Sequence, residues 1–105
     1  MAALWGGTLF NFRGAPDDPR DARLGMYSAS AARFREVARA AGADIILSNH
    51  TAYDASTIKL PVLSQRRAGD RHPYVIGADA VTRFFTVAEQ CSIAARLAEQ
   101  GVAGD

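Results

Sequence analysis

An unbroken aliphatic run at residues 45–47 (Ile-Ile-Leu) constrains the fold of this chain more than any other feature of its sequence. The run lies within a segment, residues 44–48, that is followed at once by a polar loop. Continuous branched residues of this kind predict a strand buried on both faces, as in a sheet covered by helices. In α/β proteins the loop after such a strand is where functional side chains gather. His50, at the mouth of that loop, is therefore the first candidate for a functional residue.

The rest of the chain predicts helices around this strand. Apolar residues at helical spacing predict long helices at Tyr27–Ala41 and Asp79–Glu99 and a shorter one at Ile58–Arg67. A first strand is expected at Ala2–Trp5, followed by a kink at Gly6-Gly7. The order strand, helix, strand, helix, helix is that of an α/β protein. Residues 8–12 are expected to continue extended, and residues 13–23 to form a surface loop.

The two long helices carry wide apolar faces. The stripe of the first is expected to comprise Tyr27, Ala31, Phe34, Val37, Ala38 and Ala41, and that of the second Val81, Phe84, Phe85, Ala88, Cys91 and Ala95. Two short strands offer too little sheet to cover both helices. The chain is therefore expected to be a single partial domain, residues 1–105, of a larger fold.

Composition excludes several classes of function. The 105 residues include 12 basic and 11 acidic side chains, so the net charge of +1 gives no electrostatic case for nucleic acid or an anionic membrane. One cysteine, Cys91, excludes an internal disulfide and a cysteine-rich metal site, and it is expected to be a small core residue. The amino terminus has no basic leader, so the chain as written is expected to be cytoplasmic, although an intact parent could be exported.

Several segments together resemble the C-terminal portion of metallo-β-lactamase-fold hydrolases, most closely the β-lactamase-like subclass that lacks a zinc-binding cysteine. The residues that carry this resemblance span nearly the whole chain. They are Trp5-Gly6-Gly7-Thr8, a helix with Ser28, Arg33 and Phe34, residues 43–50 (Ala-Asp-Ile-Ile-Leu-Ser-Asn-His), Lys59-Leu60, residues 72–77 (His-Pro-Tyr-Val-Ile-Gly) and the helix Val81–Cys91.

The resemblance implies a four-layer αββα sandwich with a zinc site at one edge, between two sheets. His50 matches the final metal-binding histidine of that family, and Tyr53 and Asp54 match the loop that borders its substrate pocket. In intact relatives paired zinc ions polarise a carbonyl and lower the pKa of a bridging water to about 7. The family's His-x-His-x-Asp-His signature is absent here, and the only other histidine, His72, matches no ligand position. The resemblance thus implies a truncated zinc-dependent hydrolase that is inactive alone, whose other ligands belong to a missing N-terminal half or to a separate chain.

The same residues also have plainer interpretations. A histidine after a buried strand is often a loop residue that forms hydrogen bonds, and Asp54 is favoured to cap the following turn with Tyr53 packed on it. Ser48 and His50 point to the same side of an extended chain, but no acidic residue is placed to orient the histidine and no Gly-x-Ser-x-Gly elbow is present. A serine hydrolase is therefore not favoured. The basic residues Arg66, Arg67 and Arg71 are expected to be a solvated cluster.

A second hypothesis comes from a different class of function. The chain could be a self-sufficient, non-catalytic α/β interaction protein that forms homo-oligomers through exposed apolar helix faces. The residues expected at that interface are Trp5, Phe34, Phe84 and Phe85. A dimer without metal would favour this hypothesis, whereas exposed apolar surface and aggregation would favour the partial domain.

Overall fold

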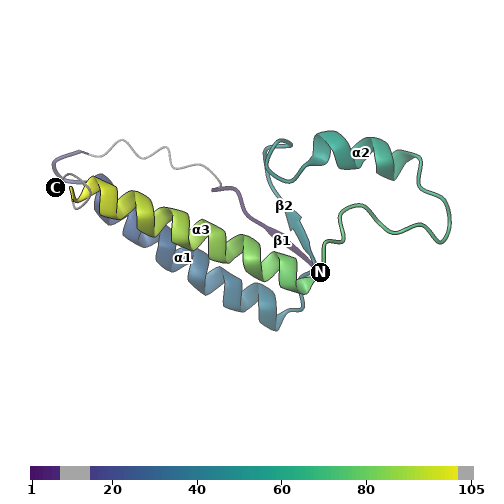
Figure 1. Ribbon diagram of the computed structural model, residues 1–105, viewed down its shortest axis with the longest axis horizontal. Helices are drawn as coiled ribbons and strands as arrows, with labels where there is room; N and C mark the ends of the chain where they lie inside the picture. The colour runs from purple at the N-terminus through teal and green to yellow at the C-terminus, as the bar shows by residue number, and fades with distance from the viewer. Residues whose placement is uncertain (8–14, 102–105) are drawn as a thin grey trace.

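The computed structural model describes residues 1–7 and 15–101 of the chain. Its elements, in order, are strand β1 (Ala2–Leu4), helix α1 (Arg20–Ala40), strand β2 (Ile45–Leu47), helix α2 (Ser56–Ser64) and helix α3 (Ala78–Glu99) (Figure 1). The protein is thus mixed α/β and mostly helical, and the expected order of elements is confirmed. The segment expected to be extended at residues 8–12 lies outside the described residues.

Helices α1 and α3 lie side by side and run in opposite directions along the long axis of the molecule (Figure 1). Leu24 and Ala31 of α1 and Phe85 of α3 are completely buried. The hydroxyl of Ser92 donates a hydrogen bond of 2.7 Å to the carbonyl oxygen of Leu24, which joins the two helices where no water reaches. Each helix therefore covers part of the other's apolar face, while Val37 of α1 and Val87 and Leu97 of α3 stay exposed.

Strands β1 and β2 form a two-stranded parallel sheet in which Ala3 is opposite Ile46. These two residues face the helices, where they join a core with Ala38, Val81 and Phe85. Side chains alternate between the faces of a strand, so Leu4 points to the other side, where it is 63% exposed. The expectation that residues 45–47 are buried on both faces is wrong, because Ile45 and Leu47 are only half-buried. Among the described residues, helices cover one face of this sheet and leave the opposite face open.

Five aromatic rings gather at the end of β1. The Trp5 ring stacks on Phe34 at 5.8 Å between centroids and meets Phe85 edge-on at 5.4 Å. Its indole nitrogen donates to the Tyr27 hydroxyl at 3.1 Å. Phe84 packs against the same core, and Phe85 is completely buried. Of the aromatic residues expected at an exposed interface, Phe85 is completely buried, whereas Trp5, Phe34 and Phe84 are partly buried against the core where α1, α3 and β1 converge.

Helix α1 begins seven residues earlier than the sequence predicts, at Arg20 rather than Tyr27. Pro19 occupies the N-cap position, where its missing backbone N–H costs no helical hydrogen bond. Asp21 places a carboxylate in the first turn, where a negative charge interacts favourably with the helix dipole. Arg23 and Asp18 form a two-bond salt bridge beside this turn. The loop expected at residues 13–23 therefore ends at Pro19.

The apolar faces are rotated slightly from those expected. In the second half of α3, Ser92 is buried, whereas its neighbour Cys91 is exposed. Val37 of α1 is exposed, and so is Ala41, which follows the last residue of that helix. Cys91 is therefore not a core residue, because the crossing of α1 over α3 places the neighbouring position, Ser92, against Leu24.

Helix α2 starts at Ser56 and ends at Ser64, with Pro61 inside it. It lies apart from the α1–α3 pair, and the chain returns from it in a long arch to the start of α3 (Figure 1). At the base of this arch the amide groups of Ile76 and Gly77 both donate to the carbonyl oxygen of Asp44. Of the helices in the described part of the chain, none combines the length and the hydropathy that crossing a membrane requires.

Candidate functional site

Both strands of a parallel sheet end at the same edge, and in α/β proteins ligands bind outside that edge. Here β1 leads into Gly6-Gly7 and β2 leads into Ser48-Asn49-His50. The Trp5 amide donates to the Leu47 carbonyl oxygen at 2.9 Å, which keeps the two chain segments together past the last paired residues. A Cβ atom added to Gly6 would lie 3.4 Å from Asn49 Oδ1. Gly6 thus lies in ordinary contact distance of the Asn49 side chain, a neighbour that only the pairing of the strands reveals.

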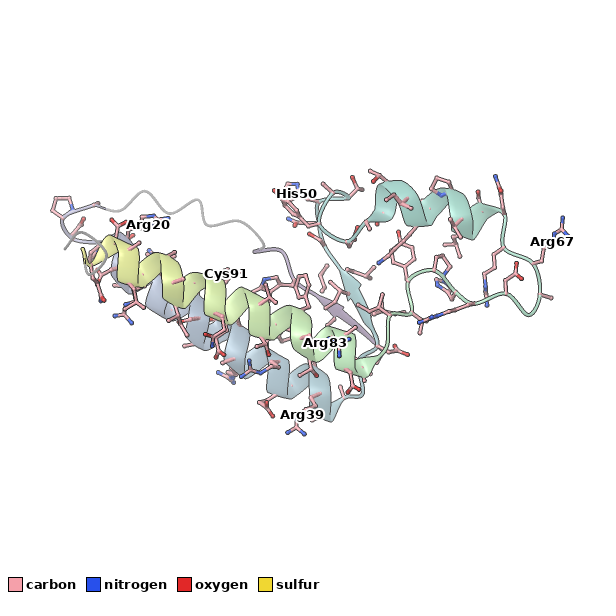
Figure 2. The ribbon with its side chains drawn as sticks, in the orientation of Figure 1. Arg20, Arg39, His50, Arg67, Arg83 and Cys91 are labelled. Atoms are coloured by element: carbon pink, nitrogen blue, oxygen red, sulfur yellow. The ribbon has the colours of Figure 1, made fainter. Side chains whose placement is uncertain are left out.

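His50 lies at this edge with its side chain exposed (Figure 2). Its backbone amide donates to the Ser48 hydroxyl at 3.2 Å, and its ring meets the Tyr53 ring edge-on at 5.5 Å between centroids. Within the described residues, neither nitrogen of the imidazole forms a hydrogen bond. The imidazole is therefore available to a proton or a metal ion, whereas the Ser48 hydroxyl contacts the backbone of His50 and not its ring.

Asp54 lies behind His50, and its carboxylate is turned into the protein. Its Oδ2 accepts the Ser48 amide at 2.9 Å and its Oδ1 accepts the Ser56 amide at 3.0 Å. Burial alone would raise the pKa of Asp54, but hydrogen bonds from Ser56 and from the Ser48 amide, with the charge of Lys59, outweigh it and hold the pKa below its ordinary value. Its negative charge also interacts favourably with the dipole of α2, because it lies at the N-terminal end of that helix. This geometry is that of a capping residue that shapes the loop, and Tyr53 is the more accessible of the two residues expected to border a substrate pocket.

A buried pair of hydroxyl groups joins the start of α2, just after the His50 loop, to the returning arch. The Ser56 and Tyr74 oxygens lie 2.6 Å apart, and the Lys59 ammonium is placed over the Tyr74 ring at 5.1 Å. Between Asp54 and Ser56 the backbone of Ala55 is left-handed, with φ of 61°. A residue other than glycine rarely adopts this conformation, so the surrounding hydrogen bonds must stabilise it. Nothing in the sequence near Ser56 or Tyr74 indicates that their side chains meet, so this pair emerges only from the fold.

The residues present supply a single metal ligand. No three histidine, cysteine, aspartate or glutamate side chains come together as a metal site in residues 1–7 and 15–101. His72 accepts the Tyr74 amide on Nδ1 at 3.2 Å and belongs to the returning arch. Both oxygens of Asp54 are already engaged. A zinc ion bound in a catalytic site generally has three protein ligands, so His50 fits as one ligand of a site and not as a site by itself. Comparisons of the chain with protein-family models, curated proteins and solved structures gave no match.

Proposed function

We propose that this chain is the C-terminal portion of a zinc-dependent hydrolase of the metallo-β-lactamase fold, and that His50 is the metal ligand it contributes. The observation that carries the proposal is the position of His50, an exposed imidazole with open ring nitrogens at the carboxyl edge of a parallel sheet. A ring with both nitrogens engaged in hydrogen bonds within the chain would have no nitrogen left for a metal ion. The remaining ligands would come from a missing N-terminal half or from a separate chain.

The open face of the sheet supports the view that the domain is partial. Helices cover the side of Ala3 and Ile46, whereas Leu4, Ile45 and Leu47 on the opposite side are exposed or half-buried. In an αββα sandwich that opposite side would pack against a second sheet. On this proposal, α1, α3 and the two strands would be one helical layer and part of one sheet of such an arrangement.

Each residue of the loop would then have a separate task. His50 would hold a metal ion, Tyr53 would border the substrate, and Asp54 would keep the loop in place through the Ser48 and Ser56 amides. Zinc, when bound in the assembled site, would supply Lewis acidity toward a carbonyl and a water of lowered pKa. A chain with one imidazole binds zinc weakly and lacks the geometry for turnover.

A zinc titration of the purified chain, followed by NMR signals of the two imidazole rings, tests the role of His50. We expect weak binding that shifts the His50 signals, that disappears in His50→Ala and that persists in the matched variant His72→Ala. We expect no hydrolysis of a chromogenic β-lactam. Binding centred on His72 would exclude His50 as the ligand, and tight stoichiometric zinc with turnover would refute the expected inactivity.

The genomic DNA around the gene tests the partial domain directly. An in-frame stretch encoding His-x-His-x-Asp-His, upstream of the Met1 codon or in an adjacent gene, is the expected finding. Co-expression of that segment with this chain should then give zinc-dependent hydrolysis that His50→Ala abolishes. Absence of any such segment would favour the second candidate below.

The second candidate is a non-catalytic protein that forms homo-oligomers through its helices. It is supported by exposed aliphatic side chains on α1 and α3, Val37, Val87 and Leu97. Of the aromatic residues, Phe85 is completely buried, and Trp5, Phe34 and Phe84 are partly buried against the core. Light scattering over a range of concentrations separates the candidates. A discrete dimer that Val87→Asp dissociates would favour this second function.

A further inference from the structure

The positive charge of this protein is concentrated on one segment. Residues 55–77, which comprise α2 and the returning arch, hold four basic residues, Lys59, Arg66, Arg67 and Arg71, and a single acidic one, Asp70. The rest of the chain holds eight basic and ten acidic residues, so it has the opposite sign. The near-zero net charge of the whole chain conceals this separation.

Ion pairing differs between the two regions as well. In the helix pair, Arg20, Arg23, Arg35 and Arg39 each form a salt bridge. Among the described residues, none of the four basic side chains of α2 and the arch does so. The Asp70 carboxylate accepts the Arg67 amide at 3.0 Å instead of pairing with a guanidinium. Figure 2 shows Arg67 at the outer tip of the arch, pointing away from the helix pair.

The segment is also hollowed. A depression of about 410 Å³ lies between α2 and the arch, with a lining of Val62, Arg71, His72, Pro73, Val75 and Ile76. A second depression of about 190 Å³ shares Val62 and Arg71 with the first and adds Gln65, Arg66 and Asp70. The two therefore adjoin, and we call them together the α2 trough. Its lining combines apolar residues, Val62, Pro73, Val75 and Ile76, with the polar side chains of Arg66 and Arg71 and their neighbours.

Backbone contacts hold the rim in place before any partner arrives. The Arg71 guanidinium donates to the Val75 carbonyl oxygen at 3.0 Å, and Arg66 Nε donates to that of Asp70 at 3.0 Å. Both side chains keep further N–H donors, since each guanidinium has five. Side chains positioned in this way lose less conformational entropy on binding.

We propose that the α2 trough binds an acidic segment of a partner protein, with an aliphatic side chain in the depression and carboxylates against Arg66 and Arg71. A depression that sets Val62, Val75 and Ile76 beside guanidinium groups suits an inserted aliphatic side chain with carboxylates around it better than a flat bilayer. Its lining holds no tyrosine, tryptophan or phenylalanine, and the half-buried His72 is the one ring among the lining residues on which a nucleic-acid base could stack. This interaction surface is separate from His50 and does not depend on the proposed metal role.

Fluorescence anisotropy tests the proposal with a short labelled peptide of glutamate and leucine. We expect saturable, salt-sensitive binding that weakens about fivefold in R66Q/R71Q, as the loss of two exposed ion pairs predicts. The matched control is R33Q/R83Q, which removes the same charge from exposed arginines of α1 and α3 that form no salt bridge within the described residues. Equal weakening in both variants would show attraction by net charge alone and would overturn the site.

Two further arms keep the test decisive if R66Q/R71Q loosens the arch. Val62→Asp removes no hydrogen-bonding group from the arch and places a negative charge in the trough, so it should also weaken binding of the peptide. A peptide with serine in place of leucine should bind less tightly than the original. Unchanged binding in either arm refutes the trough as the binding site. Phosphatidylserine vesicles or a single-stranded oligonucleotide that bind more tightly than the peptide, through Arg66 and Arg71, would refute the choice of partner.

Discussion

The hydroxyl oxygens of Ser56 and Tyr74 lie 2.6 Å apart and are both buried, although 18 residues separate them in the sequence. This contact joins the first residue of α2 to the segment that leads into α3. It is the one buried side-chain hydrogen bond between the base of the arch and the loop that carries His50 in the described part of the chain. The position of His50 therefore depends on a residue that is remote from it in sequence.

Removal of the Tyr74 hydroxyl tests this contact. Tyr74→Phe should lower the free energy of unfolding by about 1–2 kcal/mol, because the buried Ser56 hydroxyl loses its partner. The melting temperature should fall by about 4–8 °C for each kcal/mol. Tyr53→Phe, which removes an equivalent hydroxyl from the neighbouring loop, should have little effect. Equal losses in the two variants, measured by urea denaturation, would contradict a special role for the Ser56–Tyr74 pair.

Asp54 should give the stability of the protein a characteristic dependence on pH. Because the pKa of Asp54 is lower in the folded protein than its ordinary value of 3.8, its stabilising contribution is complete above pH 3.8 and is lost as the pH falls through the folded pKa. Asp54→Asn should cost about 1–3 kcal/mol at neutral pH. Urea denaturation of both proteins should show their stabilities converging below pH 3.8. The exposed Asp17→Asn is the control, and a difference that stays constant at all pH values would disprove this explanation.

The contact between Gly25 and Arg96 predicts a coupled pair of substitutions. A Cβ atom on Gly25 would lie 2.7 Å from Arg96 Nη1, so alanine there must displace the guanidinium. In an Arg96→Ala background, Gly25→Ala should stabilise the protein by about 1 kcal/mol, the helix-propensity gain. In the otherwise unchanged protein the gain should be smaller. A double-mutant cycle measures the difference, and strict additivity would mean that the two residues do not touch.

Chemical labelling of Cys91 tests the rotation of α3. An exposed thiol should react with a disulfide reagent in the native protein within about tenfold of its rate in denaturant. Ser92→Cys in a Cys91→Ala background places a thiol at the neighbouring, fully buried position, where reaction should require unfolding. Protection of Cys91 together with rapid labelling at position 92 would reverse the assignment of the helix face.

Local signals predicted most elements. The start of α3 differs by one residue from its expected position and its end is as expected, and β1 and β2 lie within their expected segments. The early start of α1 was missed because Gly25 and the charged residues before it resemble a loop. Leu24, one turn before Tyr27, was the available signal, and it is completely buried against α3. Burial of that turn outweighs the poor helix propensity of glycine.

By itself, the sequence determined what depends on neighbours along the chain: an aliphatic strand, a polar loop with His50 after it, and two long amphipathic helices. Only the tertiary structure decided which side chains meet across the chain. It placed Gly6 beside Asn49, paired Ser56 with Tyr74, and buried Ser92 rather than Cys91 against Leu24. The physical reason is that helical periodicity and strand alternation specify a face to within one residue, whereas the crossing of α1 over α3 and the pairing of β1 with β2 select the exact contacts.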